Sequence, residues 1–323
     1  TAVALNGAVI INANGSLLYT PAENFNGADT ISYEITDGSG GTSTATVSIT
    51  VNSVEDAPVA VDDVVSTDVN TGVSINVLAN DTDAEDDTLT VTSASAQNGT
   101  VTINLDGTLS YIPNTDFNGN DSIIYQITDA TGAQSSATVL VKVNAEPVAT
   151  NDVAVTEEDT VVVIDVLAND TDVNGNTLSI TNASAQNGTV VINLDGTLSY
   201  TPSTNFNGAD SISYQVSDGV GGVDSATVLV TVNAVNDGPT AIDDTFVTNE
   251  NTFTTINVLS NDNDIDGDSL TLTTASALNG TVTINVDGTL SYTPDANFNG
   301  VDSISYEISD GNGGTAAASV SMT

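Results

Sequence analysis

The stretch Asn187–Pro202, which reads NGTVVINLDGTLSYTP, carries the clearest structural signal in this sequence. Apolar side chains alternate with their neighbours along Val190–Asn193, and Leu198 and Tyr200 repeat this period of two on the return, as a half-buried β-strand requires. Asp195-Gly196 lies between the two runs, and this dipeptide favours a turn that reverses the chain. The stretch therefore predicts a β-hairpin whose apolar face, with Tyr200, joins a hydrophobic core.

The hairpin recurs along the chain with a long and nearly constant period. Its Y-x-P ending appears at Tyr19, Tyr111, Tyr200 and Tyr292, at intervals of 92, 89 and 92 residues, and an F-N-G triplet follows each copy. A period of this length is that of a small domain, so it indicates domains in tandem. We predict three complete repeats, preceded by a segment that matches only the C-terminal half of a repeat. The half-repeat, which we count as the first repeat, is 1–53. The complete second, third and fourth repeats are 54–144, 145–234 and 235–323.

The half-repeat lacks the leading strands of a complete repeat, which predicts a sheet with unpaired edges. Two explanations stay open at this point. Either the sequence is a segment of a longer chain, or a strand from another chain completes the half-repeat by strand addition. The first explanation is the plainer one.

Each complete repeat contains about seven short segments of period two, and no window shows the apolar stripe of a helix. Seven short strands in a domain of this size are typical of an aligned β-sandwich. We therefore predict an all-β protein, made of tandem β-sandwich domains arranged as an elongated rod.

The composition excludes several classes of function. Only 1 basic residue stands against 43 acidic residues, and the formal net charge of −42 repels nucleic acid and anionic membranes. The chain has no His and no Cys, so it lacks an imidazole base, a thiol nucleophile and a disulfide framework. The one basic residue, Lys142, lies in an alternating segment and is expected to face water. We expect a protein that is not an enzyme and whose clustered acids are neutralised by cations.

Three acidic loops occupy the same phase of the three complete repeats. Asp262–Asp268 reads DNDIDGD, and the related loops are Asp170–Asn176 and Asp81–Asp87. Oxygens at alternate positions of a short turn can surround Ca²⁺, which takes six to eight oxygen ligands at about 2.3–2.6 Å. The alternative is a solvated acidic turn, since Asp, Asn and Gly favour turns. We predict calcium ligation by the alternate polar residues of the loops, which are Asp81, Asp83, Glu85, Asp87, Asp170, Asp172, Asn174, Asn176, Asp262, Asp264, Asp266 and Asp268.

Each complete repeat also has a pair of polar residues near its start, at Asp62-Asp63, Asn151-Asp152 and Asp243-Asp244. Carboxylates that recur in phase with the loops would repel one another unless a cation lies among them. We predict that at least one acid of each pair completes the ligand set, which makes Asp62, Asp63, Asp152, Asp243 and Asp244 candidate ligands.

Two further sets of aspartates flank the segment that follows F-N-G. Hydrogen bonds between these side chains and the backbone of turns and strand edges explain both sets without a metal. They are Asp29, Asp121, Asp210 and Asp302 before the segment, and Asp37, Asp129, Asp218 and Asp310 after it.

Four motifs recur with these features: NDNDIDGDSL at Asn261–Leu270, the hairpin at Asn187–Pro202, NFNGADSISY at Asn205–Tyr214 and VNAVNDGP at Val232–Pro239. Together they resemble the cadherin-like and Ig-like tandem repeats of giant calcium-binding bacterial adhesins, such as repeats-in-toxin and biofilm-adhesin extender domains. The resemblance covers essentially the whole chain. It implies Ig-like or cadherin-like sandwiches, bound Ca²⁺, secretion to the bacterial surface and a role as an extender.

The resemblance also implies calcium sites at the linkers between repeats, with Asp56 and Asp237 as ligands. The linker Asn144–Pro147 has no matching acidic pair, so a linker site is least secure there. In the second repeat, Asp86 replaces the glycine of the acidic loop, which leaves the conformation of that loop less certain, although Asp tolerates left-handed backbone better than most residues.

Three functions remain open on the sequence. The first is an extracellular extender of a cell-surface adhesin, in which Ca²⁺ stiffens the tandem domains. The second is a subunit of a self-assembling filament or homopolymer, completed by strand exchange between identical chains. The third is a module that binds a glycan or a host protein. In all three the partners are neighbouring repeats or proteins and glycans outside the cell, with no nucleic acid and no membrane insertion.

Overall fold

The computed structural model describes all residues from 1 to 323, and strands dominate it, joined by turns and two single-turn 3-10 segments. The second repeat is a sandwich of a four-stranded and a three-stranded sheet. The four-stranded sheet has the order β6 (Asp63–Asp68), β12 (Gln134–Asn144), β11 (Gly119–Thr128) and β8 (Thr90–Ala96). The three-stranded sheet has the order β7 (Val73–Ile75), β10 (Leu109–Pro113) and β9 (Gly99–Ile103), and the 3-10 turn η1 (Val77–Ala79) follows β7.

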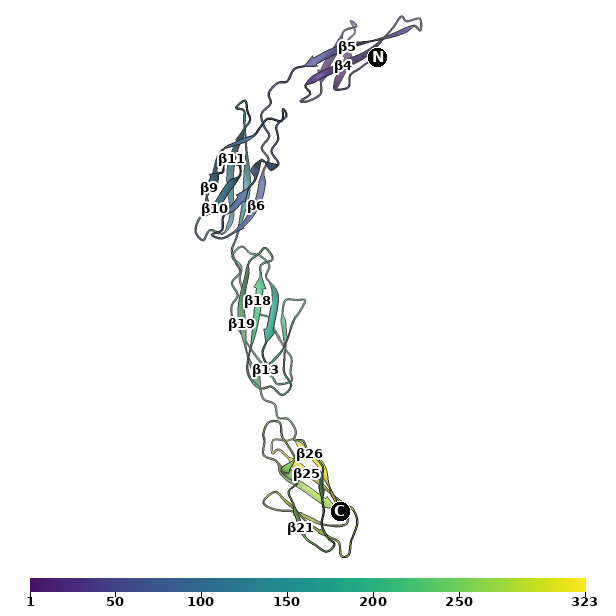
Figure 1. The fold of residues 1–323 in the computed structure, drawn as a ribbon, viewed down its shortest axis with the longest axis vertical. Helices are drawn as coiled ribbons and strands as arrows, with labels where there is room; N and C mark the ends of the chain where they lie inside the picture. The colour runs from purple at the N-terminus through teal and green to yellow at the C-terminus, as the bar shows by residue number, and fades with distance from the viewer. The chain divides into compact units, whose positions relative to one another are not determined.

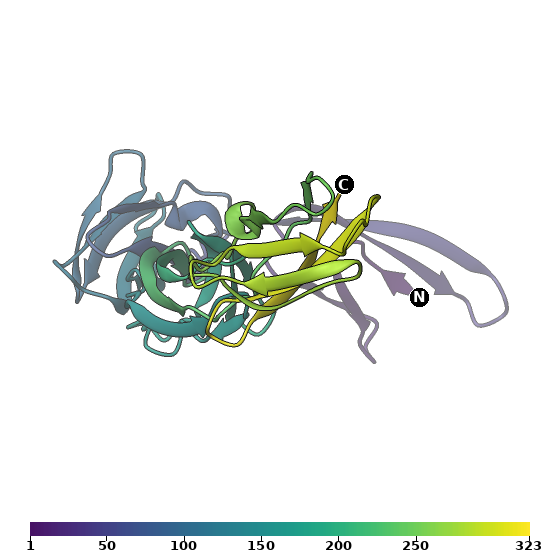
Figure 2. The same ribbon diagram turned by 90° about the horizontal axis from the view of Figure 1, so that it is seen from below.

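The third and fourth repeats have the same topology, so the prediction of about seven strands per repeat and of an all-β tandem sandwich is confirmed. In the third repeat the four-stranded sheet has the order β13 (Asp152–Glu157), β19 (Val223–Asn233), β18 (Gly208–Ser217) and β15 (Ser179–Ala185). Its three-stranded sheet has the order β14 (Val162–Ile164), β17 (Leu198–Pro202) and β16 (Gly188–Ile192). In the fourth they are β20 (Asp244–Phe246), β26 (Thr315–Met322), β25 (Asp302–Ser309), β22 (Thr271–Ala277), and β21 (Thr254–Ile256), β24 (Leu290–Pro294), β23 (Gly280–Ile284), with η2 (Val258–Ser260). Figure 1 labels β18 beside β19 in the third repeat, and Figure 2 shows the strands of the fourth repeat in yellow and green.

Residues 1–53 form an incomplete copy of this sandwich. Its sheets are β1 (Ala2–Val3), β4 (Gly27–Thr36), β5 (Thr42–Val51), and the hairpin β2 (Gly7–Ile11), β3 (Leu17–Pro21). In the second repeat the first strand, β6, pairs in parallel with the outer edge of β12, whereas β5 pairs only with β4. The inner face is consequently open: Val47 is 40% exposed, whereas its counterpart Val139 is 0% exposed. The expectation of unpaired edges in this segment is confirmed.

Each complete repeat has its own hydrophobic core, built from the alternating inward side chains of both sheets. Tyr111, Tyr200 and Tyr292, which end the hairpins, are buried as predicted. A Cβ at Gly188 would lie 2.5 Å from the ring of Tyr200, so only glycine fits against that ring. Lys142 is exposed, as expected.

The hairpin predicted at Asn187–Pro202 is confirmed, with Val190 opposite Tyr200 and Ile192 opposite Leu198. The chain reverses through Leu194-Asp195-Gly196, because Asn193 N–H donates to the Thr197 carbonyl and Gly196 N–H donates to the Asn193 carbonyl. Gly196 has a φ of +86°, the left-handed conformation that this three-residue loop needs at its last position. The glycine of the Asp-Gly signal therefore closes a loop slightly longer than the tightest hairpin turn.

The chain divides into two compact units. The first consists of Thr1–Pro147 together with Thr171–Thr177 and Asp218–Val223, which are two loops of the third repeat. The second consists of Val148–Asp170, Leu178–Ser217 and Asp224–Thr323. Neither of the short helical turns has the length or the apolar character needed to cross a lipid bilayer.

Candidate metal sites at the ends of the repeats

The third residue of each acidic loop organises its conformation. Asp264 Oδ1 accepts hydrogen bonds from the N–H groups of Asp266 and Asp268, at 3.0 and 3.2 Å. Asp83 and Asp172 accept the corresponding pairs of N–H groups in the second and third repeats. The second oxygen, Oδ2, of all three aspartates is buried and has no hydrogen-bond partner. One oxygen therefore shapes the turn, and the other is free to bind a ligand.

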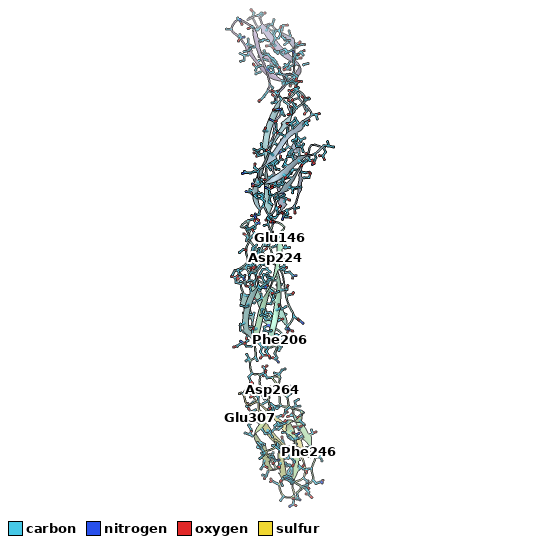
Figure 3. The ribbon with its side chains drawn as sticks, turned by 90° about the vertical axis from the view of Figure 1, so that its left-hand side faces the viewer. Glu146, Phe206, Asp224, Phe246, Asp264 and Glu307 are labelled. Carbon is cyan, nitrogen blue, oxygen red and sulfur yellow. The ribbon has the colours of Figure 1, made fainter.

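In the fourth repeat the loop gathers three carboxylates. Oxygens of Asp264, Asp266 and Asp268 all lie within 4.8 Å of one another, and Asp264 is only 7% exposed. Oxygens on opposite sides of one Ca²⁺ are about 5 Å apart, so this spacing suits that ion. Gly267 has a φ of +82°, and Asp86, which replaces the glycine in the second repeat, takes the same left-handed region at +58°. Figure 3 labels Asp264 near the linker end of the fourth repeat, whereas Phe246 lies farther along the sandwich.

The first residue of each loop belongs to a separate cluster inside the end of the sandwich. Asp170 Oδ1 accepts the N–H of Thr150 at 2.7 Å, and the hydroxyl of Tyr214 lies 3.3 Å from the same oxygen and 3.0 Å from Asp152 Oδ2. Burial raises the pKa of both carboxyl groups. The equivalent clusters are Asp63, Asp81 and Tyr125 in the second repeat, and Asp244, Asp262 and Tyr306 in the fourth. The structure thus divides each predicted loop set between two places.

The paired acids at the start of the repeats are also divided. Asp62 Oδ1 accepts hydrogen bonds from the N–H and hydroxyl of Thr138, at 2.8 and 2.9 Å, and these bonds lower the pKa of Asp62. Asp243 makes the same contacts with Ser319. The first acid of a pair therefore binds the edge of the neighbouring strand, at Thr138 within β12 or Ser319 within β26. Only the second residue (Asp63, Asp152 or Asp244) joins the tyrosine cluster.

The linker before the fourth repeat brings acids together from both of the repeats that it joins. Asp237 donates its N–H to Asp266 at 2.7 Å, and its own Oδ2 is buried without a partner. Glu158, which directly follows β13, is 4% exposed; its Oε1 accepts the N–H of Val235, and its Oε2 has no partner. Burial, followed by repulsion from Asp266, Glu158, Asp159 and Asp264, raises the pKa of Asp237. A cation between these groups would relieve that repulsion.

The linker before the second repeat forms a similar cluster around Glu55. Although Glu55 is exposed, partial loss of solvation by its neighbours, and then repulsion from Asp87, Glu85, Asp129 and Asp83, raises the pKa of Glu55. Asp56 donates its N–H to Glu85 at 3.2 Å. Asp129, which is 7% exposed, accepts four hydrogen bonds from its own turn on Oδ1, whereas its Oδ2 is buried without a partner.

The linker before the third repeat differs at the fifth and seventh loop positions, where Asn174 and Asn176 replace the acids of the other two loops. The bond from Asn144 to the following turn is not specific to it, because Asn236 donates to Asp310 in the same way before the fourth repeat. Asn144 Nδ2 donates to Asp218 Oδ2 at 2.6 Å, and Asn144 Oδ1 accepts from Asn176 Nδ2 at 2.9 Å. Asn174 Oδ1 accepts the N–H of Ala145 at 2.8 Å. Of the loop residues here, only Asp172 has a buried oxygen without a partner.

Sequence reasoning missed several acids that line these clusters. The turn-capping role predicted for Asp129, Asp218 and Asp310 is confirmed for Oδ1. The Oδ2 atoms of Asp218 and Asp310 accept hydrogen bonds from the linker amides of Asn144 and Asn236, and that of Asp129 is buried without a partner. Glu55 was noted only as the neighbour of Asp56 in an acidic linker pair and not as a ligand, and Glu158 was not identified. A comparison of the repeats could have flagged Glu158, because the second repeat has Val69 at that position.

The donor set of these clusters fits a hard cation such as Ca²⁺. All of the available ligands are oxygens, and the chain has no His or Cys to select a softer metal. Buried polar atoms normally have partners, so an unpartnered oxygen on each of Asp129, Glu158 and Asp264 needs an explanation. A bound cation supplies one, because it satisfies these oxygens and offsets the repulsion between them.

Several solved structures are similar to this chain at low identity. An N-cadherin ectodomain fragment from Drosophila is 14% identical with a TM-score of 0.38, and the match covers 99% of this chain and 91% of that chain. A variant of a three-Ig fragment of titin is 8% identical with a TM-score of 0.40, covering 84% and 99%. An endo-fucoidan hydrolase from glycoside hydrolase family 107 is 19% identical with a TM-score of 0.28, covering 84% of this chain and 44% of that chain. This chain therefore spans less than half the length of the hydrolase.

Comparison with curated proteins gave no match. Comparison with family models gave two. The model of the cadherin-like domain matches residues 143–233. The model of the bacterial Ig domain matches residues 1–50, 55–142 and 236–323, which together make up most of the chain. The chain therefore belongs to the bacterial Ig domain family, and its third repeat is cadherin-like.

Proposed function

We propose that this chain is a calcium-stiffened extender segment of a secreted bacterial cell-surface adhesin. The observation that carries the proposal is the set of buried carboxylate oxygens without partners at the ends of the repeats, on Asp83, Asp129, Glu158, Asp237 and Asp264. Carboxylates in such positions repel one another unless a cation lies among them. Tandem bacterial Ig and cadherin-like domains, with a surface too acidic for nucleic acid or anionic membranes, support the assignment to an extracellular spacer.

The linker before the fourth repeat has the clearest ligand set. Glu158 comes from the third repeat, Asp237 from the linker, and Asp264 and Asp266 from the loop of the fourth repeat. Calcium supplies positive charge and six to eight coordination positions, so one ion can bind oxygens from all three parts. Holding the linker to both repeats would restrict bending at that point. Before the second repeat, Glu55, Asp83, Glu85, Asp87 and Asp129 are the corresponding ligands.

Calcium titration tests this proposal directly. We expect titration calorimetry of the calcium-free chain to show saturable binding, and small-angle scattering to show a larger maximum dimension in calcium than in chelator. The variant Glu158→Gln should lose bound calcium. Glu157→Gln removes the same charge from the exposed neighbouring residue and is the matched control, which should bind calcium as the unmodified chain does. Absence of binding, or equal losses in both variants, would contradict the proposal.

A second candidate function is a filament subunit completed by strand exchange. A cavity of about 870 Å³ opens on the inner face of the half-repeat and is lined by apolar side chains that include Ile31, Tyr33 and Val47. The complete repeats fill the equivalent face with strands such as β6, which pairs in parallel with β12. A strand of that kind from a second copy could pair with the edge of β5. If the chain is a filament subunit, sedimentation in calcium at high protein concentration should show ordered polymers. Finding only monomers would exclude this function.

A further inference from the structure

We infer that hydrogen bonds of side-chain amides fix the linker Asn144–Pro147, before the third repeat, without a bound cation. We call this network, which consists of Asn144, Asn174, Asn176 and Asp218, the latch. Removal of calcium should therefore loosen the other two linkers and leave this one fixed. The contrast between linkers rests on the proposed function, because it requires calcium at the acidic linkers. The latch itself rests on hydrogen bonds that contain no cation. All of its residues lie in the first compact unit, which includes the two loops of the third repeat that they contact.

The three linkers share one backbone contact, made to a chemically different acceptor in one of them. The N–H groups of Asp56, Ala145 and Asp237 each donate to the fifth residue of the following loop. That residue is Glu85 before the second repeat and Asp266 before the fourth, but it is Asn174 before the third, with a donor–acceptor distance of 2.8 Å. The acceptor is therefore charged before the second and fourth repeats and neutral before the third repeat.

In the linker before the third repeat, the side-chain amides form hydrogen bonds with one another, which carboxylates cannot do. An amide side chain both donates and accepts, whereas a carboxylate only accepts. Asn144 donates to Asp218 and accepts from Asn176, and Asn174 donates to the Val143 carbonyl at 3.2 Å. At the position of Asn144, the linker before the second repeat has Glu55, which cannot donate, and Asp129 Oδ2 is left without a partner there. The linker before the fourth repeat has Asn236, which donates to Asp310 at 2.9 Å, but the loop residue that matches Asn176 is Asp268, which cannot donate to it. In the linker before the third repeat, hydrogen bonds thus satisfy the buried polar atoms, whereas a cation is needed to do so before the second repeat.

The linker is also shorter than the others. Five residues, Val143–Pro147, connect the last strand of the second repeat to the proline, whereas Val51–Pro58 and Val232–Pro239 contain eight. This deletion accounts for the interval of 89 residues between Tyr111 and Tyr200. Asn144 is consequently the last residue of β12 itself, so the latch attaches to a strand and not to a free segment.

Charge around the latch is lower than at the acidic linkers. Val69 of the second repeat corresponds to Glu158 of the third, and so removes the acid that the preceding repeat would contribute. Lys142, the only basic side chain of the protein, lines a surface cavity of about 690 Å³ together with Asn144, Asn174 and Asn176. A positive charge on the lining of this cavity, which also contains Asp68, opposes binding of a divalent cation there. Asp172 alone keeps a buried oxygen without a partner, and a single carboxylate is a poor calcium ligand set.

Hydrogen exchange of the full chain, followed residue by residue by NMR in calcium and in chelator, tests the inference. We expect chelation to accelerate exchange of the Asp56 and Asp237 amides by about tenfold or more, and to change that of Ala145 by less than about twofold. Acceleration of all three would overturn the latch and leave the proposed function standing. If Asp56 and Asp237 exchange equally in both conditions, the proposed function fails, and the variants below decide the latch.

Asn144→Ala removes the side chain that joins Asp218 to Asn176, while the acceptor of the Ala145 N–H is kept. We expect faster exchange of Ala145 in calcium and in chelator alike. Asn233→Ala, at the same strand position of the third repeat, is the matched control and should leave Ala145 unchanged. An Asn144→Ala chain that exchanges Ala145 as slowly as the unmodified chain would overturn the inference.

Asn174→Asp combined with Asn176→Asp tests the amides from the other direction, because it restores the acidic loop of the fourth repeat. Exchange of Ala145 should then accelerate in chelator and slow again when calcium is added. If Ala145 remains insensitive to calcium, the neutral amides are not what makes this linker independent of cations, and the inference is wrong.

Discussion

At the scale of single residues, the third position of the acidic loops has two separable roles. In Asp264 one carboxylate oxygen accepts two backbone N–H groups, and the other is buried without a partner. Asn keeps the first role and removes the charge, whereas Ala removes both. Substitutions at this one position can therefore distinguish loop geometry from cation binding.

We predict that Asp264→Asn lowers the melting temperature in calcium and leaves it unchanged or raised in chelator, since it removes repulsion with Asp266 and Asp268. Asp264→Ala should be less stable than Asp264→Asn in chelator by about 1–3 kcal/mol, the usual effect of losing hydrogen bonds of this kind. Thermal unfolding of both variants in the two conditions measures these differences. Equal losses in calcium and chelator for Asp264→Asn would mean that the charge serves the fold without a metal.

Acid should weaken the hairpin turns through aspartates such as Asp195. Hydrogen bonds from the hydroxyl and the N–H of Thr197 hold the pKa of Asp195 below its ordinary value of 3.8. A carboxyl group whose pKa is lowered by folding contributes stability that is present above the unfolded value and is lost as the pH falls through the folded one. The side chain introduced by Asp195→Asn does not titrate. The stability of this variant should therefore fall less than that of the unmodified chain between about pH 4 and about pH 2, the range just below the ordinary pKa of Asp. Parallel acid-unfolding curves would contradict this assignment.

At the scale of strands and loops, a tyrosine in the long central strand of each sandwich ties the acidic loop to the sheet. The hydroxyl of Tyr214, on β18, lies 2.9 Å from the Thr150 carbonyl and within hydrogen-bond distance of Asp152 and Asp170. The two carboxyl groups have pKa values raised by burial, so each depends on the few donors it has. The tyrosine therefore connects β18, the start of the repeat and the loop in one cluster.

Tyr214→Phe should destabilise the third repeat by about 1–3 kcal/mol, because it keeps the ring in the core and removes the hydroxyl that lies among the Thr150 carbonyl, Asp152 and Asp170. Denaturant unfolding, followed by a probe in the third repeat, measures the change. Tyr33→Phe in the half-repeat is the matched control, since the loop that Tyr214 contacts has no counterpart in residues 1–53. Similar small effects in both variants would show that the hydroxyl of Tyr214 contributes little.

At the scale of the whole molecule, the net charge of −42 is the dominant property. Exposed charges separated by more than a Debye length, about 10 Å at 0.1 M salt, are largely screened, and this length falls to about 3 Å at 1 M. Self-repulsion of the chain should consequently be relieved either by general screening or by specific cations.

We predict that sodium chloride raises the melting temperature strongly in chelator and only weakly in calcium, because bound calcium has already neutralised the closest carboxylates. A series of melting curves from low to about 0.5 M salt, recorded in both conditions, tests this. Potassium chloride serves as the control for specific effects of sodium. An equal salt dependence with and without calcium would show that the clustered acids bind no ion.

Much of the fold was predictable because local signals agreed with each other in every copy. Period-two alternation, the Asp-Gly turn at Asp195-Gly196 and the buried Tyr200 all appear where the sequence placed them. The parallel pairing of β6 with β12 was not predictable, since no local pattern reports which distant strand completes a sheet. The acidic loops were identified as a group, but their division between the linker and the tyrosine cluster was not.

By itself the sequence determined the strands, the hairpins, the period of the repeats and the excess of negative charge, because these depend on neighbours along the chain and on composition. Only the tertiary structure decided which acids face one another. Glu158 and Asp237 come together with Asp264 because the end of β13, the linker and the loop meet where the third repeat joins the fourth, although they are far apart in sequence. It also showed that Asn144, Asn174 and Asn176 form one network, since hydrogen bonds depend on distances that folding alone sets.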